Sequence, residues 1–318
     1  MTSLAMPAFA DRLQHNLISR LRLKQLSLLL VLERHRSLSR AAAELNLSQP
    51  AVTKALREIE EIFLTPLFHR SRAGLEATET GASVLAYARL ALADARALGD
   101  ELAVLDAGLG GRLRIGVIPF IAPAILDAAC SHALSQQPRI AVLVREGTTD
   151  ELVGALRAHE VDCVIARSFY AAGEDIVQMP LYREEPTLVV PSRAAARLSR
   201  GPLDWARLAT LDWIMPPPQT PTRRTINTMF ATAGVAPPLP LVETYSIKTI
   251  ATLLRTQPRT ITIVPRAVAV ELAHGGGAAL LPHALRWDLP PVEAMWLRRA
   301  QHSGPLMALV TALQRASG

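Results

Sequence analysis

The sequence predicts a small helical unit at the N-terminus, one long helix, and then a larger two-lobed α/β body. Three patterns carry this prediction. Between residues 37 and 61, two short runs with helical apolar spacing are separated only by Asn46, Leu47 and Ser48. Residues 79–108 repeat apolar side chains at nearly heptad spacing. From Arg112 onward, short β-rich runs alternate with helical patterns, which is typical of sheets covered by helices.

The composition is that of a globular chain. It has 318 residues, 50% of them hydrophobic and 19% charged, which allows two or three domains. No apolar run approaches the ~20 residues that a transmembrane helix needs. Residues 1–20 lack the charged and apolar blocks of a secretory signal. We therefore expect a cytoplasmic protein that does not engage a membrane.

Cys130 and Cys163 are the two cysteines of the sequence. They exclude a disulfide scaffold and show no metal-ligand spacing, so the sequence predicts neither a cofactor nor a metal. A role as small buried apolar side chains is favoured for both, and a redox switch is the alternative.

The positive charge is concentrated near the N-terminus. The whole chain carries a net charge of +6, and residues 20–74 hold ten Lys or Arg against five Glu, an excess of +5. A basic balance confined to one segment indicates a nucleic-acid-binding module attached to a nearly neutral body. The alternative is an arginine-rich solvated face.

Residues 37–61 predict a helix-turn-helix. Ser37 is a favourable N-cap for the first helix, and Ser48 or Gln49 for the second, which has Pro50 in its first turn. Leu47 is expected to fill the corner between the helices. Val52, Leu56 and Ile59 would pack inward. The outward face of the second helix then carries Gln49, Pro50, Thr53, Lys54 and Arg57.

The outward residues suit duplex DNA, since in such motifs the start of the second helix enters the major groove. Gln49 can pair with an adenine edge, and Thr53 can meet a thymine methyl or a base edge. Lys54, Arg57 and Ser48 are better placed for phosphates. Ser37 and Arg40 of the first helix complete this predicted surface. The alternative is a helical hairpin with a solvated face.

A hairpin is predicted after the second helix. The segment "PLFHRSRAGLEATETG" from Pro66 places Arg70 and Arg72 at the hairpin tip, where arginines favour the DNA backbone or a narrow minor groove. Upstream, "LRLKQLSLLLVLERHR" predicts a helix that completes a three-helix core.

The run from Leu21 to Gly81 resembles the winged helix-turn-helix of the LysR-type transcriptional regulators. The segments that carry the resemblance are "LSRAAAELNLSQPAVTKALREIEE" and "PLFHRSRAGLEATETG". It implies an all-α winged helix-turn-helix DNA-binding domain at 20–78, which binds an inverted repeat at a promoter. Most members lack an extension such as the one before Arg22, residues 1–19.

Residues 79–108 predict a linker helix, capped by Thr78 or Thr80. Its apolar seam favours pairing with a second copy, which would present two recognition helices ~34 Å apart. The alternative is a helix packed on its own core. The predicted seam consists of Leu85, Ala88, Leu92, Ala95, Leu98, Leu102 and Leu105.

Residues 112–318 predict two α/β lobes, each built on a parallel sheet with helices on both faces. Lobe I would comprise about 112–187 and 291–318, and lobe II about 188–290. The resemblance extends here to the periplasmic-binding-protein-like effector domain of LysR-type regulators. "PPPQTPTRR" and "VETYSIKT" resemble a subgroup that controls the catabolism of aromatic or sugar acids.

Ligands of open α/β sheets bind at the carboxyl ends of strands, where this sequence places polar residues. By the family likeness, the effector cleft would be lined by Pro119, Phe120, Thr148, Thr149, Pro216, Gln219, Thr220 and Ser246, to which the strand ends add Arg167 and Ser168. For each polar residue the alternative is a plain helix cap. Arg223 and Arg224 suggest an anionic effector, whereas Glu151, in a predicted capping box with Thr148, opposes one.

Two rival functions are disfavoured. An enzyme would need a motif such as GxSxG, a P-loop or HExxH, and "GLGGRL" at Gly108 precedes a strand instead of following one. A solute-binding transport protein would carry a secretory signal and no helix-turn-helix. The resemblance instead implies a homodimer, or two dimers joined as a tetramer, whose small-molecule effector alters DNA bending and the recruitment of RNA polymerase.

Overall fold

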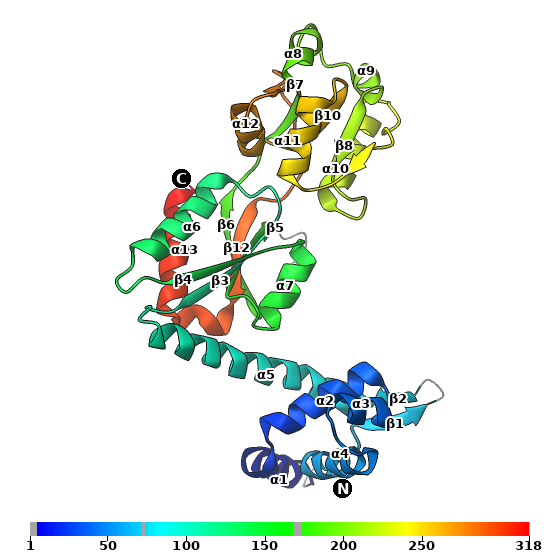
Figure 1. Cartoon of the computed structure of the whole chain (residues 1–318), viewed down its shortest axis with the longest axis vertical. Helices are drawn as coiled ribbons and strands as arrows, with labels where there is room; N and C mark the ends of the chain where they lie inside the picture. Colours follow the sequence, from blue (N-terminus) through cyan, green and yellow to red (C-terminus); the bar gives the residue numbers. More distant parts are fainter. Residues whose placement is uncertain (1–4, 72–73, 168–172, 318) are drawn as a thin grey trace. The chain divides into compact units, whose positions relative to one another are not determined.

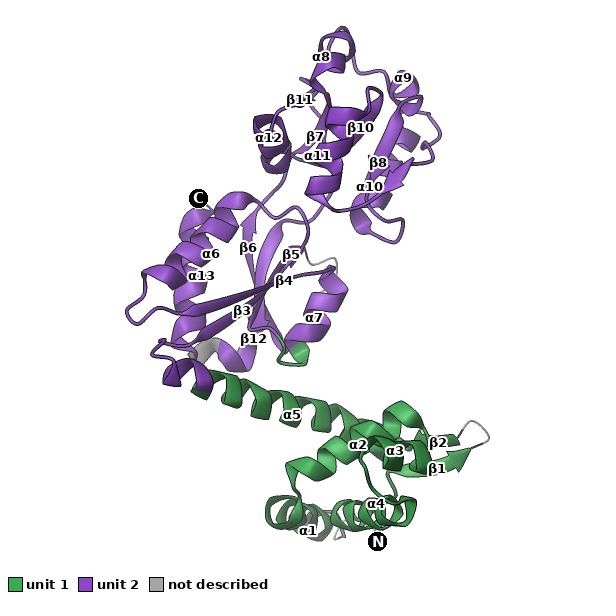
Figure 2. Cartoon of the chain, in the orientation of Figure 1, with its two compact units in different colours: residues 1–102, 157–160 green, residues 103–156, 161–318 purple. Residues whose placement is uncertain are grey.

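The structure, a computed structural model, describes residues 5–71, 74–167 and 173–317. The chain forms two compact units, shown in green and purple in Figure 2. Unit 1 comprises residues 1–102 and 157–160, and unit 2 comprises residues 103–156 and 161–318. Each unit encloses hydrophobic side chains of its own.

Unit 1 is a helical core with a two-stranded wing (Figure 1). Its elements are α1 (Ala5–Arg20), α2 (Leu23–His35), α3 (Leu38–Glu44), α4 (Gln49–Phe63), β1 (Phe68–Ser71), β2 (Gly74–Ala77) and most of α5 (Glu79–Asp106). Leu29, Val52 and Ile59 are completely buried where α2, α3 and α4 meet. The predicted winged helix-turn-helix is therefore confirmed.

The helix starts agree with the predicted caps. The hydroxyl groups of Ser37 and Ser48 each accept a hydrogen bond from the backbone N–H three residues later, at 3.4 and 3.3 Å. Pro50 lies in the first turn of α4, where its missing N–H costs nothing. Thr78 caps α5 by accepting from the N–H of Gly81 at 2.9 Å. These capping bonds satisfy donors that have no partner within the helix.

Leu47 does not fill the corner between α3 and α4. Its side chain is 48% exposed, and Leu45 packs against the core instead. Asn46 adopts a left-handed conformation with φ of 53°, and the N–H of Leu47 bonds to the carbonyl of Ala42 at 2.9 Å. This turn directs Leu47 outward, so the expectation for Leu47 was wrong.

The wing is held against the end of α2. Strands β1 and β2 are antiparallel, with Phe68 opposite Ala77. Arg36 accepts the N–H of Leu75 at 2.9 Å through its carbonyl oxygen. Gly74, at φ of 111°, makes this approach possible, because a Cβ there would lie 2.5 Å from the same oxygen.

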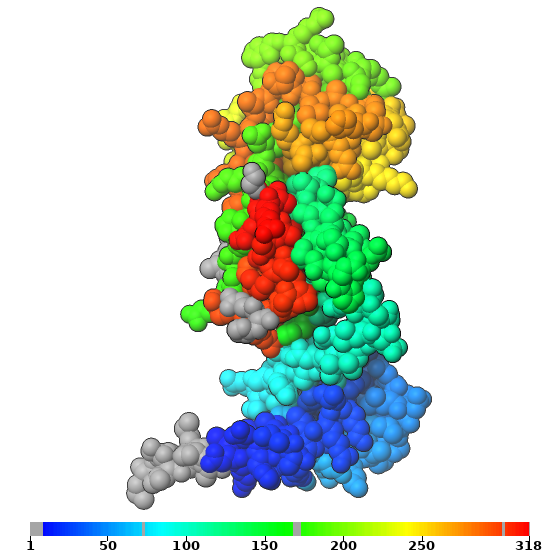
Figure 3. All heavy atoms as spheres, turned by 90° about the vertical axis from the view of Figure 1, so that its left-hand side faces the viewer, coloured from blue at the N-terminus to red at the C-terminus, as the bar shows by residue number. Residues whose placement is uncertain are grey.

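The described residues of unit 2 form two five-stranded sheets (Figure 1). The first lobe has the strand order β4-β3-β5-β12-β6. Its elements are β3 (Arg112–Val117), α6 (Pro123–Ser135), β4 (Ala141–Glu146), α7 (Thr149–Arg157), β5 (Cys163–Arg167), β6 (Ile176–Tyr182), β12 (Val292–Leu297), a 3₁₀ helix (Arg298–His302) and α13 (Gly304–Ala316). Helices α6 and α13 lie side by side, the latter in red in Figure 3.

The second lobe has the strand order β11-β7-β10-β8-β9. Its elements are β7 (Pro186–Pro191), α8 (Ser192–Leu198), α9 (Trp205–Ala209), β8 (Asp212–Met215), α10 (Pro221–Thr232), β9 (Val242–Glu243), α11 (Ile247–Thr256), β10 (Thr260–Pro265), α12 (Arg266–His274) and β11 (Ala278–Leu280). The chain crosses from the first sheet to the second at residues 183–185 and returns at 281–291.

The sheets are mixed, which corrects the prediction of parallel sheets. β3 pairs in parallel with β4 and β5, but β12 runs antiparallel to both β5 and β6. In the second lobe β7 is antiparallel to β10 and β11. The reason is the double crossover, because β12 returns from the second lobe and enters the first sheet in the opposite direction.

Among the residues that the structure describes, no helix is both long and apolar enough to span a bilayer. The described His, Cys, Asp and Glu residues likewise form no cluster of three that could hold a metal ion. Cys163 is completely buried, and burial raises the pKa of its thiol to about 12. A protonated, enclosed thiol is unsuited to redox chemistry at neutral pH.

Candidate functional site

The N-terminal end of α4 presents the predicted recognition residues to solvent. Ser48, Gln49, Pro50, Lys54 and Arg57 are exposed, and Thr53 is half-buried. The opposite face of α4 is packed in the core of unit 1. The outward face is therefore available to a macromolecule along the first two turns of the helix.

Gln49 and Thr53 are hydrogen-bonded to one another. The side-chain amide nitrogen of Gln49 donates to the Thr53 hydroxyl at 3.0 Å. That hydroxyl donates to the backbone carbonyl of Gln49, also at 3.0 Å. The Gln49 amide keeps its oxygen and one N–H for another partner. Thr53 thus restrains the side chain that the sequence selects for reading bases, a relation that sequence spacing alone does not show.

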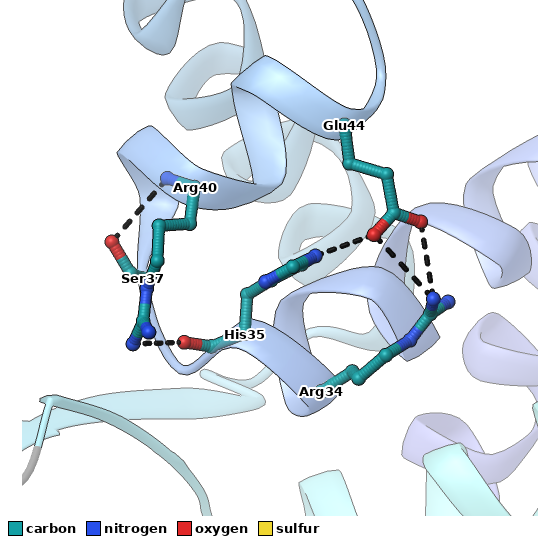
Figure 4. Close-up of polar contacts among 5 residues, drawn as sticks. All are labelled: Arg34, His35, Ser37, Arg40 and Glu44. Atoms are coloured by element: carbon teal, nitrogen blue, oxygen red, sulfur yellow. Dashed lines mark hydrogen bonds and ion pairs between the residues drawn. The ribbon is translucent and has the colours of Figure 1, made fainter.

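A polar cluster joins the end of α2 to α3 (Figure 4). The Glu44 carboxylate contacts the His35 imidazole and lies 3.2 Å from the Arg34 guanidinium. The hydrogen bond from His35 is the main reason that the pKa of Glu44 is lowered. The Arg40 guanidinium donates to the His35 carbonyl at 2.6 Å while remaining exposed. The cluster fixes α3, the first helix of the motif, against α2.

Two further predicted basic residues, Lys54 and Arg70, lie on the surface of unit 1. Lys54 is paired with Glu58 on the next turn of α4 at 3.9 Å, and both side chains are solvated, so the pair is weak. Arg70 is exposed on β1. Arg72 lies outside the described residues.

The predicted apolar seam of α5 has a buried part and an exposed part. Leu85 and Ala88 are buried in the core of unit 1. Leu98, Leu102 and Leu105 are 56%, 57% and 51% exposed. The alternative of a helix packed on its own core is therefore confirmed for the first part of the seam, and pairing through the exposed second part stays a prediction.

In unit 2, the carboxyl end of β5 holds a buried arginine between the lobes. Arg167 is 7% exposed and forms an ion pair with Glu184, which lies in the crossover between the two sheets. Burial lowers the pKa of Arg167 to about 10, so the guanidinium stays charged at neutral pH. Its Nε atom is buried and has no hydrogen-bond partner among the described residues.

Two tyrosines, Tyr182 and Tyr245, interact electrostatically with this arginine, and a phenylalanine contacts one of them. Tyr182, the last residue of β6, accepts the N–H of Ala122 at 2.9 Å, and burial raises its pKa. Phe120 from the first lobe contacts Tyr245 from the second edge-to-face, with ring centroids 5.7 Å apart. Phe120 has a φ of 65°, a conformation that costs a bulky residue energy and recurs at binding sites.

Several predicted effector residues are helix caps in the structure. The Glu151 carboxylate accepts both the N–H and the hydroxyl of Thr148 at 2.8 Å, and the backbone bond is the main cause of its lowered pKa. Thr220 and Ser246 cap α10 and α11. The capping box is confirmed, and it occupies the Thr148 hydroxyl with a neighbouring carboxylate.

The other predicted positions differ in their surroundings. Thr149 donates to the carbonyl of Arg167 at 3.2 Å, which brings it beside the arginine. Thr220 hydrogen-bonds Tyr245. Pro119 is half-buried, Pro216 is buried and Gln219 is exposed. Ser168 lies outside the described residues.

The two arginines of α10 both donate to backbone carbonyls of the loop that precedes the helix. Arg223 donates to the carbonyl of Pro216 at 2.9 Å and to the Glu243 carboxylate at 3.1 Å. Arg224 donates to the carbonyl of Gln219 at 3.3 Å. These contacts weaken the support that Arg223 and Arg224 gave to an anionic effector. Arg223 is as buried as Arg167, and the Nε atoms of both lack a hydrogen-bond partner among the described residues.

Sequence reasoning missed Tyr182, Glu184 and Trp287. The indole N–H of Trp287, on the returning crossover, donates to the carbonyl of Glu184 at 3.0 Å. Glu184 and Trp287 come from the two crossovers, and Tyr182 ends the strand before the first one. The strands that flank the first crossover were not predicted separately. The one available signal was the pair of strand-like runs on either side of "YREEP".

Two family models match the chain. "Bacterial regulatory helix-turn-helix protein, lysR family" matches residues 23–82, and "LysR substrate binding domain" matches residues 106–318. The boundaries of these matches correspond to the helix-turn-helix with its wing and to the two-lobed body.

Curated relatives that match most of this chain are transcriptional regulators. The chain is 29% identical over 301 residues to the HTH-type transcriptional regulator GbpR of Azospirillum brasilense, covering 94% of this chain and 87% of the relative. It is 31% identical over 274 residues to GalR of Pseudomonas putida, covering 86% and 67%. It is 28% identical over 303 residues to PcaQ of Agrobacterium fabrum, covering 94% and 96%.

Solved structures share the fold. The full-length LysR-family regulator CbnR, complexed with its target DNA, has a TM-score of 0.61 at 21% identity, covering 93% of this chain and 100% of that chain. LysG from Corynebacterium glutamicum with bound effector Arg has a TM-score of 0.58 at 17% identity, covering 93% and 98%.

Proposed function

The chain belongs to the LysR family of transcriptional regulators, and from this premise we propose how it reads DNA and senses a small molecule. Family members are regulators and not enzymes, as the sequence predicted. The chain accordingly has a DNA-binding domain and an effector-binding domain. We propose boundaries at 20–78 for the former, 79–108 for the linker helix and 112–318 for the latter. Its proposed place of action is chromosomal DNA in the cytoplasm.

The proposed base-reading group is the pair of Gln49 and Thr53. Their mutual hydrogen bonds leave the Gln49 amide oxygen and one N–H free, which is the donor–acceptor pair that matches an adenine edge in the major groove. Because Thr53 already restrains Gln49, less side-chain entropy is lost when the amide meets the base. This exposed pair at the start of α4 is the observation that most supports the proposal.

The proposed backbone contacts surround this pair. Such contacts set the register of the protein on DNA but carry no sequence information. The residues assigned to them are Ser37, Arg40, Ser48, Pro50, Lys54, Arg57, Arg70 and Arg72. The exposed positions of Lys54, Arg57 and Arg70 support this assignment.

We further propose that two chains pair through the exposed leucines of α5 and bind a promoter inverted repeat. A solvated row of Leu98, Leu102 and Leu105 is the apolar surface that a second copy would cover. Two such dimers would form a tetramer, and its contact with RNA polymerase would adjust transcription.

The proposed effector is a small organic acid, aromatic or sugar-derived, bound between the lobes. Arg167 supports an acid, since its buried Nε lacks a partner among the described residues. The rings of Phe120 and Tyr245 supply an apolar wall. Pro119, Thr149 and Thr220 lie in the segments that follow strands β3, β4 and β8. Glu184 already pairs with Arg167, so the acid would share that guanidinium.

Two measurements test the proposal. Fluorescence anisotropy of the full chain on a fragment from its own promoter should show an affinity at least ~10³-fold above that for scrambled DNA. Thermal unfolding with a panel of aromatic and sugar acids should show a higher midpoint for one of them, reduced in Tyr245→Ala, which removes the ring, and retained in Arg224→Ala. Stabilisation by neutral sugars alone would reject the acid.

A further inference from the structure

Helix α1 precedes the segment that the family's helix-turn-helix model matches, which begins at residue 23. It packs beside α4 in unit 1 (Figure 1). Leu13 and Leu17 are partly buried against the core, and Asn16 between them is 8% exposed. A polar side chain that is buried on an otherwise solvated helix calls for a specific partner.

The partner of Asn16 is the end of α4. Its amide nitrogen donates to the Ile62 carbonyl at 3.2 Å. Ile62 is the second-last residue of α4, and the last four carbonyls of a helix have no partner within it. Asn16 therefore caps the recognition helix from a separate element.

The same end of α4 is also attached to the wing. The Glu60 carboxylate accepts the N–H groups of Leu67 and Phe68 at 2.8 and 3.2 Å. The carboxyl end of α4 is thus fixed on one side by the wing and on the other by α1. The amino end, which carries Gln49, is free on its outward face.

Fixing one end of α4 determines where the other end lies. With 15 residues, the helix is ~21 Å long at 1.5 Å per residue. A tilt of about 5° around its carboxyl end moves Gln49 by about 2 Å, which breaks a hydrogen bond to a base edge. Binding groups must be held to about 0.5 Å for full effect.

We propose that α1 is a positioning helix for DNA recognition, and that Asn16 is its positioning residue. By capping Ile62, Asn16 fixes the angle at which α4 presents Gln49 and Thr53 to the major groove. This inference rests on the proposed DNA-binding function. It assigns α1 no contact with DNA.

The test compares full-chain variants on a duplex selected from random DNA by the unmodified protein. Asn16→Asp keeps the side-chain size but replaces the donor with a carboxylate that repels the Ile62 carbonyl, and Asn16→Ala removes the donor without adding charge. Gln14→Ala, at an exposed position of the same helix, is the control. The measurements are specific affinity, non-specific affinity, the salt dependence of each, hydrogen exchange and the stability of the dimer.

Loss of the cap should lower the specific affinity of both Asn16 variants about threefold to tenfold, the range expected for a lost buried hydrogen bond. Non-specific affinity and the salt slope should not change, because no phosphate contact is lost. Hydrogen exchange in residues 60–64 should accelerate in both variants. Gln14→Ala should match the unmodified protein.

Three results would overturn the inference. Unchanged specific affinity in both variants would show that Asn16 acts on stability only. A lower salt slope would show that α1 contacts phosphates, for which Arg12 is exposed. A weaker dimer would assign α1 to subunit contact through Phe9 and Ile18, which are 47% and 79% exposed. Failure of the unmodified chain to bind any DNA would instead refute the proposed function.

Discussion

At the scale of single residues, the proposed recognition of DNA sequence depends most on Gln49. Gln49→Ala should weaken operator binding by about 1–3 kcal/mol and relax the preference at one base pair, because the bidentate contact to that base is removed. Thr53→Val should relax the preference at the same base pair to a smaller extent. It leaves Gln49 in place and only releases its amide from the hydrogen bond with Thr53. Binding to a set of operators with every single-base change measures both effects. Unaltered preference at all positions would reject the assignment.

The two cysteines give a second residue-scale prediction. Burial raises the pKa of Cys163 to about 12, so its thiol stays protonated and enclosed at pH 8. In a Cys130→Ser protein, a thiol reagent should therefore label Cys163 only at the rate of unfolding. Labelling that is complete within minutes in the folded protein would revive the redox-switch alternative.

Residue roles that depend on neighbours in sequence could be predicted, and those that depend on distant segments could not. The caps formed by Ser37, Ser48 and Thr148 need only residues three positions away. The ion pair of Arg167 with Glu184 joins the end of β5 to the crossover between the two sheets, and no local pattern encodes it. The expectation for Leu47 was wrong because of a local feature. Asn46, the residue before it, adopts a left-handed conformation that directs the Leu47 side chain outward.

At the scale of secondary-structure elements, α5 carries a prediction about assembly. Leu102→Asp should shift the chain from dimer toward monomer in analytical ultracentrifugation, because a charge would be buried in the proposed seam. Glu101→Ala, also on the exposed part of α5, is the matched control. A dimer of unchanged stability in Leu102→Asp would move the subunit interface elsewhere.

The wing and the outer face of α4 carry a prediction about salt. Arg70→Ala and Lys54→Ala should each weaken binding to all sequences alike and reduce the slope of log K against log salt by about one. Arg193→Ala, exposed on α8 in unit 2, should leave the slope unaltered. Slopes that stay constant in the first two variants would show that these side chains miss the phosphates.

Helices were easier to predict than the direction of strands. The apolar spacing of α4 and α11 is visible in their own residues, and both formed as expected. Strand β12 pairs with β5 and β6, more than a hundred residues earlier, so its antiparallel direction follows from the path of the chain and not from its composition. The run "LPLVETYS" forms a strand only at Val242–Glu243, because the prolines before it cannot donate to a ladder.

At the scale of the whole molecule, the proposal couples a small-molecule site to DNA through a dimer. An effector can shift the equilibrium between two arrangements only by its difference in affinity for them. The Arg167–Glu184 pair is placed to supply such a difference, since it links a strand of the first lobe to the crossover that leads to the second. Any change in lobe angle alters the surroundings of that guanidinium.

The most direct test of the central claim is a hydroxyl-radical footprint of the full chain on its own promoter. The account predicts two protected half-sites on one face of the duplex, separated by about one helical turn or a whole multiple of it. Gln49→Ala should weaken both half-sites together. A single protected site, or no protection at low ionic strength, would contradict the claim that paired α4 helices read the DNA.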